Sequence, residues 1–108
     1  MARALVVVEA GICGFVTTIT AEMDEEGMVA VAIASDCANC CSLAQENLVI
    51  DPTSLLRGKA KDNPVFAAVA RHPLHHACPV PIGIIKAVEV AAGLALPRNA
   101  TIKVEKVE

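Results

Sequence analysis

The chain has 108 residues, of which 55% are hydrophobic, and its formal net charge is −3. This length predicts a single domain over residues 1–108 with one apolar core. Because the chain has no Trp and no Tyr and its acidic and basic residues are interspersed, it lacks the basic patches and aromatic platforms that bind nucleic acids, and we expect no nucleic-acid partner.

The longest apolar stretch, from Ala77 to Leu96, predicts a core helix rather than a membrane span. It carries Lys86 and Glu89, whereas a membrane-spanning helix is nearly free of charge. At the N-terminus, Glu9 interrupts the apolar run and no cleavage-like spacer follows it, which is not typical of a signal peptide. We therefore expect a cytoplasmic protein with no membrane partner.

Three segments rich in β-branched residues predict strands in the first third of the chain. They are Arg3–Ala10, Phe15–Met23 and Met28–Ala34, and they are separated by the connectors Gly11–Gly14 and Asp24–Gly27. Connectors this short favour an antiparallel meander. The acidic second connector is typical of a solvated turn rather than of a paired-carboxylate site.

Three helices are predicted after these strands. Ser35 and Asp36 have the side chains that cap a helix N-terminus, and they precede the first helix. Asn63 followed by Pro64 is typical of the start of the second helix. The expected helices are Cys37–Asn47, Pro64–Arg71 and Cys78 to about Ala95.

The C-terminal segment Thr101–Val107 alternates Ile and Val with charged residues, which is typical of a half-exposed strand. A helical crossover before it would place it parallel to the first and third strands, beside either of them. The predicted fold class is α+β: a three-stranded antiparallel meander plus a C-terminal strand, with about three helices packed on the sheet as a two-layer sandwich.

The sequence contains five cysteines. An odd number, an ample core and the lack of an export signal argue against a secreted disulfide scaffold. In a reducing compartment, cysteines are more often buried, metal-bound or reactive. The cysteines are therefore the first candidates for a functional site.

The predicted meander indicates which cysteines meet. Cys13 lies between the first two strands, and Cys37 follows the third strand at the same end of the sheet. Cys78 joins them if the third helix starts at that end, and the opposite arrangement would break the cluster. Helix N-termini at Cys37 and Cys78 would stabilise thiolates. Gly11 and Gly14 would let the backbone approach a bound group.

Three thiolates could hold an iron–sulfur cluster or a zinc ion, with Cys40, a histidine or an external group as the fourth ligand. The Cys78-Pro79 pair is similar to the Cys-Pro pair of bacterial-type ferredoxins. Of the three histidines, His76 is the first candidate ligand, although histidines in a polar loop are usually solvated. The residues expected to support the site are Gly11, Gly14, Asp36, Asn39 and Pro79.

The segment Cys37–Cys41 contains a C-x-x-C motif. This spacing occurs in zinc ribbons, in iron–sulfur proteins and in thioredoxin-like redox pairs. A thioredoxin match fails because no βαβ unit precedes the motif, and a zinc ribbon would need a second C-x-x-C. Cys40 and Cys41 also fit small core positions on a helix.

Three segments occur in order along the chain: Ala10–Phe15 (AGICGF), Ser35–Asn39 (SDCAN) and Ala77–Pro81 (ACPVP). Over most of its length the chain resembles a small uncharacterised family from methanogenic archaea and anaerobic bacteria. The resemblance implies no activity, but it does imply an anaerobic, cytoplasmic setting. The matching cysteines are 13, 37 and 78, whereas Cys40 and Cys41 look peculiar to this chain.

Three functions are consistent with these patterns. The first is metal or iron–sulfur binding through Cys13, Cys37 and Cys78, with Cys40 as a further ligand. The second is a thiol-based redox or sulfur-transfer protein with a matching partner, in which one thiolate attacks and another thiol resolves. The third is a non-catalytic homodimeric module, because the third helix has a wide apolar face. Whether the protein is an enzyme stays open.

Overall fold

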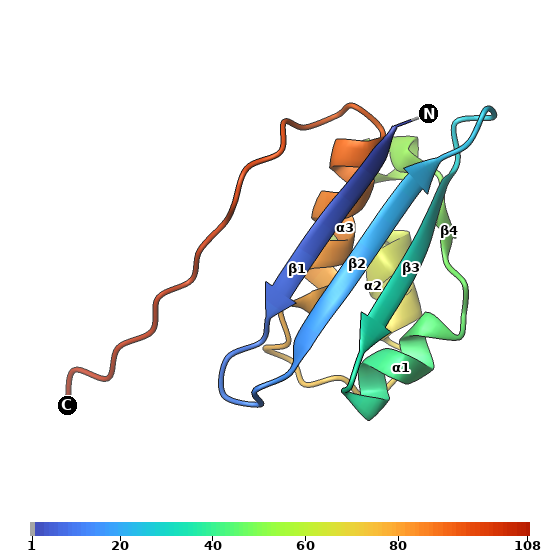
Figure 1. The fold of residues 1–108 in the computed structure, drawn as a ribbon. Coiled ribbons are helices and arrows are strands. Elements are labelled where there is room, and N and C mark those ends of the chain that lie inside the picture. Colours follow the sequence, from blue (N-terminus) through green and yellow to red (C-terminus); the bar gives the residue numbers. More distant parts are fainter. Residues whose placement is uncertain (1) are drawn as a thin grey trace.

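The computed structural model describes residues 2–108 and shows an antiparallel sheet with helices packed on one face (Figure 1). The strand order is β1-β2-β3-β4, and each strand pairs with its neighbour in antiparallel orientation. The predicted α+β class and the meander of the first three strands are confirmed. The strands are β1 (Arg3–Glu9), β2 (Val16–Met23), β3 (Val29–Ser35) and β4 (Val49–Ile50).

The two connections of the meander are tight turns. In the first, Gly11 and Gly14 have φ values of +90° and +75°, and the Gly14 N–H donates to the Gly11 carbonyl at 2.9 Å. Residues with a side chain rarely adopt such φ values. In the second turn, Asp24 Oδ1 accepts from the backbone N–H groups of Glu26 and Met28 at 2.9 and 3.0 Å, which confirms a hydrogen-bonded turn there.

The helices are shorter than predicted. At α2, Asn63 Oδ1 accepts from the Val65 N–H at 2.8 Å, so the predicted cap is confirmed. At α1, the predicted caps are wrong, because Cys37 occupies the N-cap position and makes no side-chain cap hydrogen bond. Asp36 is exposed. Ser35 Oγ accepts from the Cys37 N–H at 3.1 Å, one residue before the helix begins. The helices are α1 (Ala38–Ala44), α2 (Pro64–Val69) and α3 (Val80–Ala91), with 3₁₀ turns η1 (Pro52–Leu56) and η2 (Ala60–Asp62).

The fourth strand is not the predicted C-terminal one. β4 pairs with β3 through Val29↔Ile50 and Ala30↔Val49. Residues 101–107 are extended and exposed, and no strand within residues 2–108 pairs with them. Their alternating pattern indicates that the segment can form a strand, but it carries no information about the partner that would supply the hydrogen bonds.

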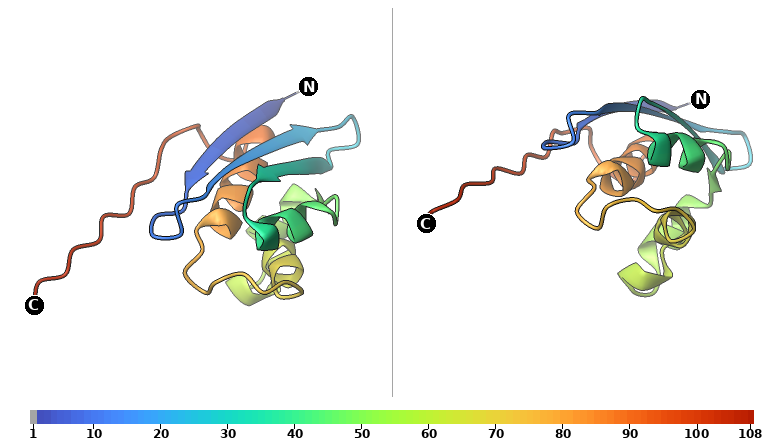
Figure 2. Two further views of the ribbon diagram at one scale, coloured as in Figure 1. Left: turned by 60° about the horizontal axis from the view of Figure 1, so that its bottom comes forward. Right: turned by 90° about the horizontal axis from the view of Figure 1, so that it is seen from below.

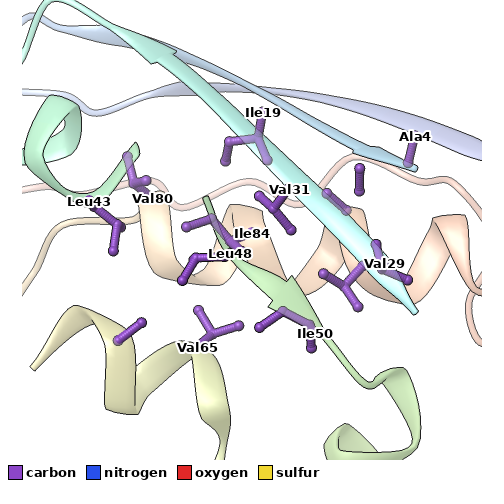
Figure 3. Close-up of a cluster of buried hydrophobic side chains, with 14 of the residues drawn as sticks. Ala4, Ile19, Val29, Val31, Leu43, Leu48, Ile50, Val65, Val80 and Ile84 are labelled. Carbon is purple, nitrogen blue, oxygen red and sulfur yellow. The ribbon is translucent and has the colours of Figure 1, made fainter. Parts of the chain in front are cut away.

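The core lies between the sheet and the three helices, and α3 covers β1 and β2 (Figures 2 and 3). A Cβ built on Gly83 would lie 2.6 Å from Val8 Cγ2 and 3.1 Å from Ile19 Cδ1, so only glycine lets α3 approach β1 and β2 this closely. The contact with Val8 also places the start of α3 at the end of the sheet where β1 ends. Fully buried side chains of the core are Ile19, Val29, Leu43, Val65, Val80, Ile84 and Val88.

The apolar residues of α3 are mostly directed at this core. Seven of its residues are buried, whereas Ile82 and Lys86 on the opposite side are exposed. Burial of one large aliphatic side chain contributes roughly 1.5–3 kcal/mol, so burial against the sheet accounts for the width of the apolar face within one chain. Across residues 2–108, the longest helices fall short of the length and apolarity that a membrane crossing requires.

Candidate functional site

The end of the sheet at which β1 ends and β2 begins carries three segments with cysteines. The β1–β2 turn, the start of α1 and the residues before α3 all lie there (Figures 1 and 2). The antiparallel directions of β1, β2 and β3 bring the first two segments together, and the contact of Gly83 with Val8 brings the third. These segments contain Cys13, Cys37 and Cys78.

Cys37 and Cys40 form a pair at the start of α1. Cys37 is half-buried at the N-cap of α1, and Cys40 is one turn further on, 2% exposed and directed into the core. The backbone N–H of Cys40 is the main cause that lowers the pKa of Cys37. The Asn39 N–H and the Cys40 thiol lower the pKa further, while partial burial opposes them. Cys37 is therefore the thiol that the structure favours as a thiolate.

Cys40 has the opposite environment. Burial is the largest cause that raises the pKa of Cys40 to about 12, followed by the negative charge of Cys37 and the hydrogen bond between the two sulfurs. The charge of Cys78 raises it further, and a hydrogen bond with Thr17 opposes the shift. At neutral pH, Cys40 is therefore a neutral thiol.

A small network of hydrogen bonds connects the start of α1 to the sheet. Thr17 and Ser35 are paired across β2 and β3, and Thr17 Oγ1 donates to Ser35 Oγ at 2.8 Å. Ser35 Oγ also accepts from the Cys37 N–H. Thr17 is buried despite its hydroxyl group, and its hydrogen bonds satisfy that group. The first turn of α1 is thus fixed by two strands.

Cys78 lies close enough to affect Cys40, but it is not at a helix start as predicted. Pro79 occupies the N-cap position of α3, and the half-buried Cys78 precedes it in a turn in which its N–H donates to the His75 carbonyl at 3.0 Å. Its charge contributes to the raised pKa of Cys40. Cys78 is therefore a neighbour of the Cys37–Cys40 pair.

Cys13 and Cys41 are both exposed. The interactions described for residues 2–108 give Cys13 no partner at Cys37, Cys40 or Cys78. A Cβ at Gly11 or Gly14 would meet no atom within 4 Å, so these glycines serve the turn conformation and surround open space. The expected approach of this backbone to a bound group stays a prediction.

Cys41 points away from the pair, and its Sγ donates to the Ser35 carbonyl at 3.0 Å. His75 and His76 are exposed in the loop before α3. In the part of the chain that the structure describes, residues 2–108, no group of three or more His, Cys, Asp or Glu side chains is arranged to hold a metal ion.

A second polar cluster, which the sequence did not indicate, joins the end of α1 to the end of α2. Arg71 contacts Glu46 with its Nη2 2.5 Å and its Nε 3.2 Å from Oε1. His72 Nε2 contacts the other carboxylate oxygen, Glu46 Oε2. The hydrogen bonds from Arg71 and His72 lower the pKa of Glu46 to about 2. The cluster anchors the helix that carries the cysteine pair.

Sequence reasoning also missed Thr17 and Ser35 as parts of the site. The sequence did contain a signal for the burial of Thr17. Side chains alternate between the two faces of β2, and this places Thr17 on the same face as Ile19 and Ala21. A buried threonine at the end of a strand needs a hydrogen-bond partner, but its identity depends on the strand register. Glu46 and Arg71 lie 25 positions apart, and no local pattern connects them.

Comparison with known proteins gives one match. Residues 4–104 match a family described as "Family of unknown function (DUF6951)". No curated protein and no solved structure matches the chain. The match extends from the second residue of β1 into the C-terminal segment, and it includes Cys13, Cys37, Cys40, Cys41 and Cys78. The chain belongs to this family of unknown function, DUF6951.

Proposed function

We propose that the protein is a thiol–disulfide exchange protein in which Cys37 attacks and Cys40 resolves. The observation that carries this proposal is the position of the two cysteines at the start of α1, where Cys37 is half-buried at the N-cap and Cys40, three residues later, is buried. A thiolate is the attacking species in disulfide exchange, and the backbone N–H groups of Cys40 and Asn39 help to lower the pKa of Cys37. The C-x-x-C spacing keeps both sulfurs in one helical turn.

In the first step, the Cys37 thiolate attacks one sulfur of a substrate disulfide. The substrate S–S bond breaks, a mixed disulfide forms at Cys37, and the first substrate thiolate leaves and takes a proton from solvent. Bond formation removes the negative charge from Cys37. Because that charge is one cause of the raised pKa of Cys40, the pKa of Cys40 falls when the mixed disulfide forms.

In the second step, Cys40 loses its proton and its thiolate attacks Cys37 Sγ. The mixed disulfide breaks, the second substrate thiolate leaves, and a Cys37–Cys40 disulfide forms. Two electrons have then moved from the protein to the substrate, and of the two protons that the substrate thiolates take up, one comes from Cys40 and one from solvent. Reversal of the same steps oxidises a dithiol partner. The anaerobic, cytoplasmic setting implied by the sequence resemblance would keep the resting pair reduced.

A redox titration tests this proposal. The reduced protein is equilibrated with glutathione buffers of increasing oxidised fraction, acid-quenched and mapped by mass spectrometry. We expect reversible formation of a single Cys37–Cys40 disulfide, which Cys37→Ser abolishes and Cys41→Ser leaves unchanged. A reversible disulfide between another pair, or none, would contradict the proposal.

Metal binding is a second candidate, favoured by the position of Cys78 beside the pair. In this proposal Cys37, Cys40 and Cys78 ligate zinc or an iron–sulfur cluster, and Cys13 on its exposed turn is the fourth ligand. Cys78→Ser separates the two functions, because disulfide exchange does not use Cys78. Protein purified without oxygen should contain stoichiometric iron or zinc that Cys78→Ser removes. Equal metal contents in the two proteins would reject this site.

A further inference from the structure

The two edges of the sheet differ in length. The β4 edge is two residues long, and edges this short give little room for another strand. The β1 edge extends over seven residues, Arg3–Glu9, and within residues 2–108 β1 pairs only with β2. Between its charged ends, β1 is entirely apolar and has no proline. A long apolar edge of this kind is a template for a further strand.

The C-terminal segment has the properties of a strand without a partner. Beyond α3 the chain is extended, and Ile102 and Val104 are 81% and 91% exposed. Figure 1 shows that the segment leaves the fold near the start of β1 and runs outside the β1 edge without joining it, and both views in Figure 2 agree. β-branched residues that alternate with charged residues favour strands, so this conformation is ready to pair.

The edge and the segment also match in length and in character. Residues 101–107 and β1 each supply seven residues for pairing. Leu5 and Val7 are 68% and 58% exposed on the bare outer face of β1, and Ile102 and Val104 share one face of an extended segment because side chains alternate. Pairing can place Ile102 and Val104 beside Leu5 and Val7 as cross-strand neighbours. The family match extends to residue 104, so the segment is not an appendage of this chain alone.

We propose that residues 101–107 add as a strand to the β1 edge of a second copy, so that the protein is a strand-exchanged homodimer. The segment diverges from its own β1, and the chain extends over 50 Å along its longest axis but only 27 and 25 Å along the others. In a two-fold dimer each segment would reach the edge of the partner, and both unpaired edges would be covered by the same exchange.

Sedimentation equilibrium of the full chain tests this proposal, together with two proline variants. Val104→Pro removes a backbone donor in the middle of the pairing segment, whereas Glu108→Pro lies beyond it and is the matched control. Both positions are exposed, so neither variant should disturb the core. We expect twice the 11.2 kDa mass of one chain for the native protein and for Glu108→Pro, and at least tenfold weaker association for Val104→Pro.

Hydrogen exchange identifies the surface that pairs. The amides of β1 should be protected in the native protein at concentrations where the dimer forms, and Val104→Pro should remove that added protection. A monomer in which Val104→Pro still deprotects β1 would show pairing within one chain and overturn the proposal. A dimer that Val104→Pro leaves intact would overturn it as well, and so would a native monomer without protection. The variants do not touch Cys37 or Cys40, so thiol reactivity is an independent readout.

Discussion

The cysteine pair Cys37–Cys40 and the two exposed cysteines Cys13 and Cys41 lie at the same end of the sheet but in different environments. The pair lies at the start of α1, where Cys40 is buried and the Cys37 N–H donates to Ser35 Oγ at the end of β3. Cys13 is on an open turn, and Cys41 is exposed with its Sγ hydrogen-bonded to the Ser35 carbonyl. The comparison teaches that cysteines at the same end of a sheet can differ widely in burial and in hydrogen-bond partners, and these two properties control the reactivity of a thiol.

The largest expected effect is on thiol reactivity. Among the five cysteines of the reduced protein, Cys37 should be alkylated fastest at neutral pH, because backbone hydrogen bonds favour its thiolate. Cys37→Ser should remove this fast phase and slow the first alkylation severalfold, because the thiolate is the form that reacts. Cys13→Ser is the matched control and should keep the fast phase. Stopped-flow labelling measures both rates, and a fast phase that persists in Cys37→Ser would break the comparison.

Stability should separate Cys40 from its neighbour Cys41. Cys40→Ser places a hydroxyl group in a site that is 2% exposed, and we expect a loss of about 1–3 kcal/mol in the free energy of unfolding. Cys41→Ser changes an exposed side chain and should stay within about 0.5 kcal/mol of the native protein. Urea denaturation of reduced samples measures both. Equal losses would show that Cys40 is not a core residue.

A smaller effect is expected at Thr17, whose hydroxyl group donates to Ser35 Oγ. Thr17→Val keeps the shape and removes the hydroxyl group, which should cost about 1 kcal/mol. The next residue, Thr18, lies on the outer face of β2 and is only half-buried, so Thr18→Val is the control and should change stability by less than about 0.5 kcal/mol. If the two variants are equally stable in urea, the polar network does not hold the pair.

The smallest effect concerns the other end of α1, where Arg71 and His72 lower the pKa of Glu46 to about 2. Because the folded pKa lies below the unfolded value of about 4.3, this carboxylate stabilises the fold above that value and loses its contribution as the pH falls toward 2. Glu46→Gln should therefore be less stable than the native protein at pH 6, and the difference should shrink on acidification. Thermal unfolding at several pH values measures this trend, and a constant difference would contradict it.

The sequence predicted the elements of the fold better than their partners. β-branched runs located β1, β2 and β3 within about two residues, and Asn63-Pro64 located the start of α2. Residues 101–107 have a strand pattern, yet within residues 2–108 no strand pairs with them. The pattern reports a local preference, whereas pairing depends on an edge elsewhere in the chain or in another molecule.

Only part of the candidate site was predicted, because the sequence gives local positions but not the partners that the fold brings together. The C-x-x-C spacing places Cys37 and Cys40 in one turn, which is local information. The hydrogen bond between Thr17 and Ser35 depends on the register of β2 with β3, because the two residues are 18 positions apart in the sequence. The Glu46–Arg71–His72 cluster depends on the packing of α1 against the end of α2. Neither register nor helix packing can be read from a local pattern.

Trapping of the mixed disulfide tests the central claim most directly. Cys13→Ser and Cys41→Ser remove the exposed thiols, and this background is then compared with and without Cys40→Ser after a pulse of oxidised glutathione. With Cys40 present, the adduct at Cys37 should be transient and should convert to the Cys37–Cys40 disulfide. With Cys40→Ser, the adduct should persist on Cys37. An adduct that persists while Cys40 is present, or a first adduct on Cys78, would contradict the assignment of Cys37 as the attacking thiol and Cys40 as the resolving one.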